Sequence, residues 1–220
     1  MKGTLLALEG ISGAGKSTLR DRLLSAARAE GLPLGHIGQF SWLSLPATRT
    51  IVHLRSGRRA ATSADAMQAA RRDLELHGRY NLAPALARGH VVADRLTLST
   101  ACLLALVHRL PVADCVQQLA EVPAARAHVT ILLTTQPALC HERLSRRATP
   151  RRFGEDPSTA ARLADLYEQA AAAWTETTGL PVRRHPCTND TDLDGLTTIC
   201  LARLLRAPLR TAPPQRSTPL

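Results

Sequence analysis

The residues best suited to chemistry lie near the N-terminus, in a Gly-x-x-x-x-Gly-Lys-Ser sequence that begins at Gly10. Glycines in such a loop permit backbone angles that turn successive N–H groups inward, so that the loop and the following helix N-terminus form a concave anion site. Lys16 supplies a mobile positive charge for the β- and γ-phosphates, and the Ser17 hydroxyl is the expected Mg²⁺ ligand. We predict that a nucleoside triphosphate binds along the loop, at Gly10, Ser12, Gly13, Ala14, Gly15, Lys16, Ser17 and Thr18.

A carboxylate that could complete this site follows a second apolar segment. Residues 91–93 form a predicted strand that ends in Asp94 and Arg95. A carboxylate at the end of a strand beside a phosphate loop can hold Mg²⁺ directly or through water, or accept the proton of an attacking hydroxyl. We therefore predict Ser17 and Asp94 as metal ligands. The alternative for Asp94 is a structural salt bridge at the end of the strand.

A second basic segment is rich in arginine. Five arginines fall within ten residues, namely Arg143, Arg146, Arg147, Arg151 and Arg152. Like charges at this spacing repel one another unless an anion lies among them. The pattern predicts a mobile lid over about residues 143–157, whose arginines close on the transferring phosphates. We count Arg143 among the ATP contacts. A basic loop exposed to solvent is the alternative.

The acceptor pocket is predicted at the end of a weak second strand, residues 34–40. In an open parallel sheet, ligands bind beyond the carboxyl ends of the strands. Gln39, Phe40 and Trp42 are therefore candidate lining residues. Phe40 and Trp42 are equally compatible with a place in the hydrophobic core.

Two predicted helices carry further arginines. Residues 63–88 are predicted to form one long helix, and either Arg71 or Arg72 on it could face the acceptor. An earlier helix, over residues 48–59, ends in a basic cluster that we interpret as a solvated helix end. The cluster consists of Arg55, Arg58 and Arg59.

The elements that must position these residues alternate between strand and helix patterns. Leu5 to Leu8 form the apolar run of a buried parallel strand, and an amphipathic helix follows the loop to about Ala29. The alternation predicts a three-layer α/β domain with a parallel sheet over residues 1–206. Several prolines and no apolar periodicity predict a disordered tail over residues 207–220.

Composition narrows the classes of partner. The 220 residues contain no apolar run near 18 residues and no signal peptide, which predicts a cytoplasmic protein without a membrane segment. Five cysteines without close pairing indicate neither a zinc site nor a disulfide framework. The net charge is +10, but only 3% of the residues are aromatic, too few for base-stacking platforms. The charge therefore favours a small anionic nucleotide over nucleic acid.

Three sequence motifs together resemble the thymidylate kinase family. They are residues 8–18 with the phosphate loop, Pro84-Ala85-Leu86-Ala87-Arg88-Gly89, and Val92-Ala93-Asp94-Arg95. The resemblance covers roughly residues 4 to 205. It implies a nucleoside-monophosphate-kinase fold with a five-stranded parallel sheet, Mg-ATP as donor and, often, a homodimer.

The resemblance also implies roles for individual residues. Glu9 and Asp94 would lie near Mg²⁺ and the acceptor, and Arg95 would contact the acceptor phosphate. Arg71 or Arg72 would match the family's arginine on the helix before Pro84. The arginine-rich lid is similar to the lid-arginine subtype, in which one side chain reaches the phosphates; the candidates are Arg147, Arg151 and Arg152.

Departures from the family pattern lie on the acceptor side. Ser12 replaces the usual acidic residue of the loop, and Gly38-Gln39-Phe40-Ser41-Trp42 stands where Arg-Glu-Pro is expected. Leu96 occupies the position of the usual Tyr or His, and Cys102-Leu103-Leu104 replaces the expected Tyr-Gln pair. The donor side is therefore intact, while the acceptor side is rewritten.

We conclude from the sequence that the chain is a P-loop kinase that moves the ATP γ-phosphoryl group to a nucleoside monophosphate, with dTMP as first choice. One alternative acceptor is a hydroxyl of a nucleoside, sugar or natural product. An alternative of another class is a nucleotide-binding regulatory protein without transferase activity. The candidate catalytic residues are Glu9, Lys16, Asp94, Arg95, Arg147, Arg151 and Arg152.

Overall fold

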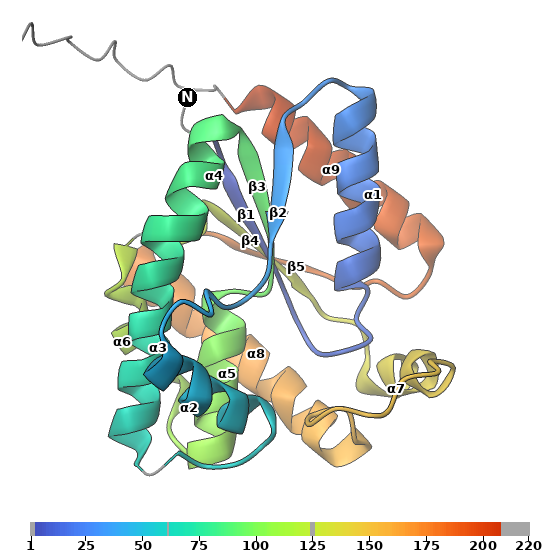
Figure 1. The fold of residues 1–220 in the computed structure, drawn as a ribbon. Coiled ribbons are helices and arrows are strands. Elements are labelled where there is room, and N and C mark those ends of the chain that lie inside the picture. The colour runs from blue at the N-terminus through green and yellow to red at the C-terminus, as the bar shows by residue number, and fades with distance from the viewer. Residues whose placement is uncertain (1–2, 61, 124–125, 208–220) are drawn as a thin grey trace, which may run out of the picture.

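A single parallel sheet organises the chain in the computed structural model, which describes residues 3–60, 62–123 and 126–207. Its five strands run in the order β2-β3-β1-β4-β5 (Figure 1). The strands are β1 (Leu5–Glu9), β2 (Leu34–Ile37), β3 (His90–Asp94), β4 (Val129–Leu133) and β5 (Val182–His185). The predicted α/β fold with a parallel five-stranded sheet is confirmed.

The burial of each strand agrees with its position in the sheet. Every residue of β1 and β4 is buried, as expected of central strands covered on both faces. The two edge strands, β2 and β5, expose polar or small residues at their centres, which are His36 and Gly35 in β2 and Arg183 and Arg184 in β5. Charged and short edge strands oppose further strand pairing.

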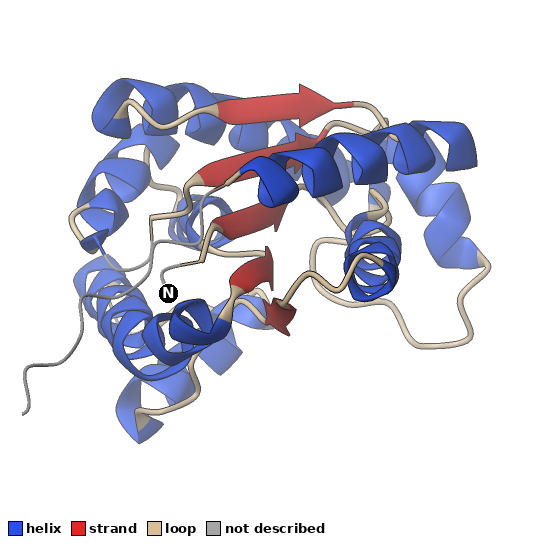
Figure 2. Ribbon diagram, turned by 90° about the horizontal axis from the view of Figure 1, so that it is seen from above, coloured by secondary structure: helices blue, strands red, loops and turns tan. Residues whose placement is uncertain are grey.

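Helices cover both faces of the sheet (Figure 2). Helices α1 and α9 pack against each other on one face, and the α3, α5, α6 and α8 group lies on the other (Figure 1). The helices are α1 (Lys16–Ala29), α2 (Leu45–Arg55), α3 (Ser63–His77), α4 (Ala83–Arg88), α5 (Thr97–His108), α6 (Val112–Ala120), α7 (Pro137–Ser145), α8 (Pro157–Thr178) and α9 (Asp190–Arg206). Within the described ranges, no helix is long and apolar enough to cross a membrane.

The long helix predicted over residues 63–88 is interrupted. Helix α3 ends at His77, a π-helical turn spans Gly78–Leu82, and α4 begins at Ala83. Pro84 lies just after this turn, and a proline within helical backbone removes one helical hydrogen-bond donor, which is a common cause of such an irregularity. The backbone keeps right-handed helical dihedrals at Gly78, Leu82 and Ala83, so the predicted start at Ser63 and end at Arg88 are confirmed, and the π-helical turn is the only departure from the prediction in this segment.

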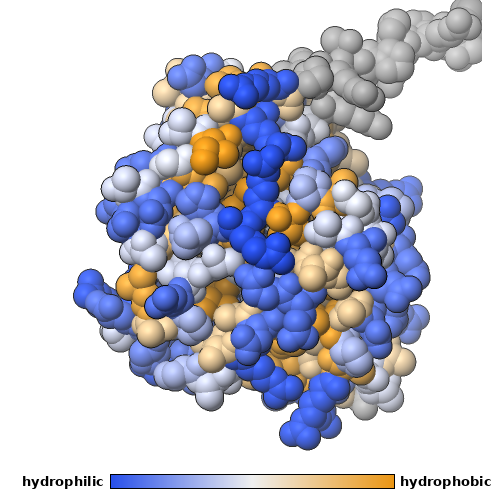
Figure 3. All heavy atoms as spheres, turned by 180° about the vertical axis from the view of Figure 1, so that it is seen from behind, coloured by the Kyte–Doolittle hydropathy of each residue, from blue (hydrophilic) through white to orange (hydrophobic). Residues whose placement is uncertain are grey.

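The surface seen from behind carries mostly hydrophilic side chains, with hydrophobic ones between them in small groups (Figure 3).

Residues 208–220, which make up most of the predicted tail, lie outside the described residues.

Candidate active site

The phosphate loop connects the end of β1 to the start of α1, at the carboxyl edge of the sheet. All three of its glycines adopt backbone angles that disfavour a side chain, with φ of 131° at Gly10, 82° at Gly13 and 105° at Gly15. A Cβ at Gly10 would lie 2.6 Å from the carbonyl oxygen of Leu133, and one at Gly13 would lie 2.6 Å from that of Cys140. The loop therefore needs glycine at both positions to pack on β4 and α7.

Lys16 is turned into the loop. Its Nζ donates hydrogen bonds to the carbonyl oxygens of Gly10, at 2.9 Å, and of Ile11, at 2.7 Å. The side chain is buried, and this burial, together with the charge of Arg95, lowers the pKa of Lys16 to about 7. A phosphate beside Nζ would favour the charged form, because an opposite charge stabilises the ammonium group.

Ser17 and Asp94 meet at the mouth of the loop. The register between β1 and β3 pairs Leu8 with Asp94, so the carboxylate ends beside the start of α1. Ser17 Oγ donates to Asp94 Oδ2 at 3.4 Å, and Arg20 Nη1 donates to the same oxygen at 2.9 Å. Arg20 follows Ser17 by three helical positions, and this spacing is the signal in the sequence that would have identified it.

A hydroxyl and a carboxylate this close form an oxygen donor set that suits Mg²⁺. Such an ion takes its remaining ligands from water and substrate phosphates. The described residues contain no group of three or more His, Cys, Asp or Glu side chains placed to hold a metal.

Arg95 joins the phosphate loop to the far side of the cleft. Its Nη1 donates to the carbonyl oxygen of Gly10 at 2.8 Å and to Tyr167 Oη at 2.6 Å, and its Nη2 donates to Ser12 Oγ at 3.4 Å. The residue has a positive φ of 72°. Backbone strain of this kind persists only where the surroundings hold the residue in place.

Glu9 lies behind Arg95 and does not line the cleft. Its carboxylate accepts hydrogen bonds from the backbone N–H groups of Leu96, Leu98 and Ser99, at the start of α5. Ser99 Oγ donates to it as well. Burial raises the pKa of Glu9. The structure thus places Glu9 where it fixes the strand-to-helix connection that carries Asp94 and Arg95.

The predicted lid comprises the end of α7, the start of α8 and the loop between them. Arg147 forms an ion pair with the buried Glu155 at 2.7 Å, and the same carboxylate accepts from the backbone N–H of Arg152 at 2.9 Å. Arg143 donates to the carbonyl oxygens of Gly13, at 3.4 Å, and of Thr188, at 2.9 Å.

Only three of the five lid arginines face the cleft. Arg143, Arg147 and Arg152 line the cleft. Arg146 pairs instead with Glu142 on α7, and Arg151 lies 3.3 Å from a ring nitrogen of His141; neither lines the cleft.

All three aromatic and amide residues that we predicted for the acceptor pocket lie in the cleft. Gln39, Phe40 and Trp42 line it, and Gln39 Nε2 donates to Thr100 Oγ1 at 3.2 Å. Phe40 is buried and Trp42 is 45% exposed, with their ring centroids 5.3 Å apart in an edge-to-face arrangement. Phe40 is therefore both a core residue and a wall of the cleft.

Two residues that the sequence analysis missed hold the loop from Gly38 to Trp42. The buried Asp73 carboxylate accepts from the backbone N–H groups of Ser41 and Trp42 and from Ser41 Oγ. His77 Nε2 lies 3.0 Å from the carbonyl oxygen of Gly38. Asp73 and His77 are four positions apart on α3, the spacing of one helix face, which is the only signal that the sequence offers.

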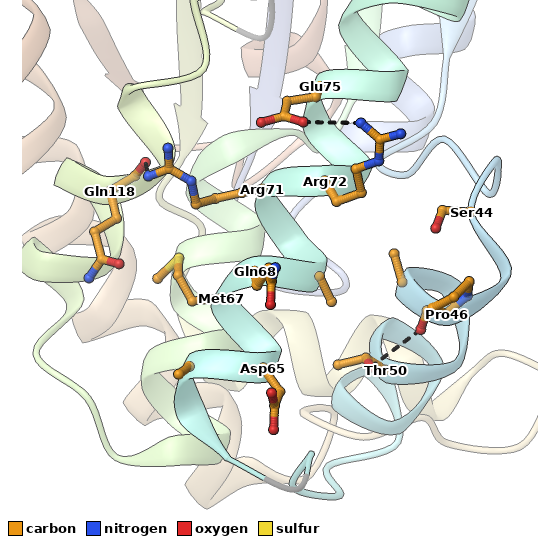
Figure 4. Close-up of a pocket in the computed structure, with 13 residues that line it drawn as sticks. Ser44, Pro46, Thr50, Asp65, Met67, Gln68, Arg71, Arg72, Glu75 and Gln118 are labelled. Carbon is orange, nitrogen blue, oxygen red and sulfur yellow. Dashed lines mark hydrogen bonds and ion pairs between the residues drawn. The ribbon is translucent and has the colours of Figure 1, made fainter.

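Arg71 and Arg72 lie outside this cleft. They line a separate groove of about 710 Å³ between α2 and α3 (Figure 4). Arg71 pairs there with Glu121 at 2.6 Å, and Arg72 pairs with Glu75 at 3.4 Å. Because Asp73 and Leu74 face inward, helical periodicity turns Arg71 and Arg72 away from the acceptor side. The expectation that one of them faces the acceptor does not match their position.

Arg55, interpreted above as part of a solvated helix end, lines the cleft instead. Its guanidinium carbon lies 5.9 Å from the ring centroid of Phe40 and 5.6 Å from that of Trp42.

The charges in the cleft are unbalanced. The cleft has a volume of about 760 Å³, and its lining contains six basic and three acidic side chains. The basic ones are Lys16, Arg55, Arg95, Arg143, Arg147 and Arg152, and the acidic ones are Asp94, Glu155 and Asp190. Such an excess in a concave site attracts anions.

Comparison with known proteins gives two matches. The family model for thymidylate kinase matches residues 8–178. A curated thymidylate kinase of Albidiferax ferrireducens is 39% identical over 100 residues, which are 45% of this chain and 45% of that relative. The matching stretch thus spans less than half of the relative's length.

Proposed function

The chain belongs to the thymidylate kinase family, and from this premise we propose that it transfers the γ-phosphoryl group of ATP to a nucleoside monophosphate, with dTMP as the first acceptor. The observation that carries the proposal is a single cleft with the phosphate loop at one end, an aromatic and amide wall at the other, and a twofold excess of basic side chains.

The donor half would bind ATP through the loop amides and Lys16. In this role Lys16 exchanges its contacts with the carbonyl oxygens of Gly10 and Ile11 for phosphate oxygens. Ser17 and Asp94 would hold Mg²⁺, which would neutralise negative charge on the phosphates. Arg147 and Arg152 would stabilise charge on the transferring group from the lid side.

The acceptor half favours an anionic acceptor over a neutral hydroxyl compound. Arg95 lies between the phosphate loop and the Phe40–Trp42 wall, which suits an acceptor phosphate in line with the donor. The six basic and three acidic side chains leave the lining with a net charge of +3, and a positive lining favours an anionic acceptor over a neutral one.

The test is Mg²⁺-dependent ADP formation with dTMP, other nucleoside monophosphates, nucleosides and sugars, with the mass of each product recorded. We expect dTMP to give the diphosphate, and Lys16→Ala to abolish turnover. Turnover of unphosphorylated acceptors alone, or unchanged turnover in Lys16→Ala, would refute the proposal.

A further inference from the structure

Arg20 contacts the candidate metal ligand Asp94 but does not itself line the cleft. Its Nη1 lies 2.9 Å from Asp94 Oδ2, and the two side chains are only 22% and 18% exposed. Solvent and salt screen a partly buried pair less than an exposed one. The ion pair therefore forms a firm connection between helix α1 and the end of β3 that carries Asp94.

A second carboxylate holds the other edge of the same guanidinium. Nε and Nη2 of Arg20 both lie 2.8 Å from Asp21 Oδ1, which leaves Nη1 for Asp94. Contacts along two edges of a planar group fix its orientation as well as its position. The two carboxylates and one guanidinium carry a net charge of −1, the same as Asp94 alone. Asp21 thus offsets the charge of Arg20, and the charge of Asp94 remains available to a cation.

The contacts of Asp94 are confined to one of its two carboxylate oxygens. Ser17 Oγ, at 3.4 Å, and Arg20 Nη1, at 2.9 Å, both donate to Oδ2. No hydrogen bond or ion pair from the described part of the chain reaches Oδ1. A carboxylate held by one oxygen keeps a fixed orientation and still offers the other oxygen to a hard cation.

We propose that Arg20 is a positioning residue for Mg²⁺, which holds Asp94 by Oδ2 and so keeps Oδ1 available to the metal or to its bound water. The inference rests on the proposed function, because it takes Ser17 and Asp94 as metal ligands, and it deepens that function by assigning the residue that orients Asp94. A ligand that is ordered before the metal arrives lowers the entropic cost of binding.

The experiment measures how strongly Mg²⁺ assists nucleotide binding, without any turnover. Calorimetry gives the dissociation constant of the non-hydrolysable β,γ-imido analogue of ATP in EDTA and in Mg²⁺, and the ratio of the first constant to the second is the metal dependence. The wild type is compared with Arg20→Gln, Arg20→Lys and a matched control, Arg28→Gln. Arg28 is an exposed arginine in the last turn of the same helix and does not line the cleft. Thermal melting checks that each variant folds.

We expect Arg20→Gln to reduce the metal dependence about tenfold, as the loss of a residue that orients a metal ligand does. The dissociation constant in EDTA should change less than about twofold, because Arg20 does not line the cleft. Arg20→Lys should fall between, because an ammonium group keeps the charge but loses the planar fork that serves both carboxylates. Arg28→Gln should match the wild type.

A double-mutant cycle shows whether Arg20 acts through Asp94. Asp94→Asn should reduce the metal dependence by itself, and adding Arg20→Gln to it should cause less than about a further twofold loss. Losses that multiply would mean that Arg20 acts by another route, and they would overturn the inference. A metal dependence that is unchanged or larger in Arg20→Gln would overturn it as well, because the guanidinium would then either leave metal binding unaffected or oppose it.

The results separate this inference from the proposed function. If the wild type shows the expected metal dependence but transfers no phosphoryl group to any acceptor, the proposed function fails and the positioning role of Arg20 stands. If the wild type transfers the phosphoryl group while Arg20→Gln keeps the full metal dependence, the inference fails and the proposed function stands. A wild type that binds the nucleotide equally well in EDTA and in Mg²⁺ would also overturn the inference.

Discussion

At the scale of single residues, Lys16 is buried, although its proposed role, binding the phosphates of ATP, requires a charged ammonium group. Its pKa of about 7, caused first by burial and then by Arg95, leaves the free side chain about half charged at neutral pH. A bound triphosphate raises that pKa, so binding takes up a proton. We expect ATP affinity to decrease as the pH rises above about 7, and calorimetry in buffers of different ionisation enthalpy to report the uptake.

The control for this proton uptake is the inactive Lys16→Ala variant. Any residual nucleotide binding by it should show a smaller dependence of the binding enthalpy on the buffer. An ATP affinity that stays constant between pH 6 and 9 would contradict the assignment of the proton to Lys16.

Asp94 gives a second prediction at this scale. Its carboxylate accepts from Ser17 and Arg20, and we have proposed it as a metal ligand. Asp94→Asn keeps the shape and removes the charge, so we expect kcat to fall by about a hundredfold and the Mg²⁺ concentration for half-activation to rise. A Mg²⁺ titration of activity checks this. If Asp94 only held Arg20, the variant would lose thermal stability while its Mg²⁺ requirement stayed unchanged.

At the scale of elements, helix α3 shows what the sequence could and could not reveal. The start signals at Ser63 and Asp65 and the stop signal at Gly89 predict a helix there, and the helix exists. The sequence does not show which of its polar residues lie inward, because α3 buries seven of its fifteen residues and one of these, Asp73, is charged. Arg71 and Arg72 line another groove, whereas Asp73 is the residue of α3 that binds the loop of Ser41 and Trp42.

Arg55 was predicted to lie at a solvated helix end, and this prediction also failed because the sequence does not show which side of a helix faces the cleft. A basic residue in the last turn of a helix is normally solvated and interacts well with the helix dipole. Only the position of Phe40 and Trp42, which depends on long-range packing, turns that side chain into the cleft. The phosphate loop could be predicted without knowledge of long-range packing, because all of its residues lie within the continuous segment 10–18.

Asp73 gives the prediction at this scale. Asp73→Ala leaves the N–H groups of Ser41 and Trp42 without their acceptor, which should cost about 2 to 4 kcal/mol of unfolding free energy. Because the freed loop carries the acceptor wall, the KM for dTMP should also rise while the KM for ATP stays the same. Urea unfolding and steady-state kinetics give the two values.

Glu75→Ala serves as the control on the same helix. Glu75 forms an exposed pair with Arg72, so its removal should cost less than about 1 kcal/mol and leave both KM values unchanged. An Asp73→Ala variant as stable as Glu75→Ala would contradict the assigned role.

At the scale of the whole molecule, the sheet depends on contacts between segments far apart in the chain. The backbone N–H of Thr4 donates to His90 Nδ1 at 3.0 Å, and that of Leu5 donates to His128 Nδ1 at 2.9 Å. The two histidines stand at the starts of β3 and β4, the neighbours of β1 on either side. The strands were predictable from their apolar runs, but this pairing follows only from the strand order.

These two histidines make the stability of the molecule depend on pH. Nδ1 must be unprotonated to accept a hydrogen bond, and burial lowers the pKa of both His90 and His128 below the ordinary value of 6.5. The unfolded chain therefore binds more protons than the folded one below pH 6.5, so stability is complete above that pH and falls as the pH decreases through it. Urea unfolding at pH 8 and pH 5.5 should show the loss.

Variants identify the groups responsible for this loss. His90→Gln and His128→Gln should each reduce the difference in unfolding free energy between the two pH values, because a glutamine oxygen accepts without titrating. Burial also lowers the pKa of His77 and His108, so part of the difference should remain in the double variant. Replacing the exposed His36 by Gln should leave the difference as in the wild type. If the double variant kept the full wild-type difference in unfolding free energy, His90 and His128 would not be the cause of the acid sensitivity.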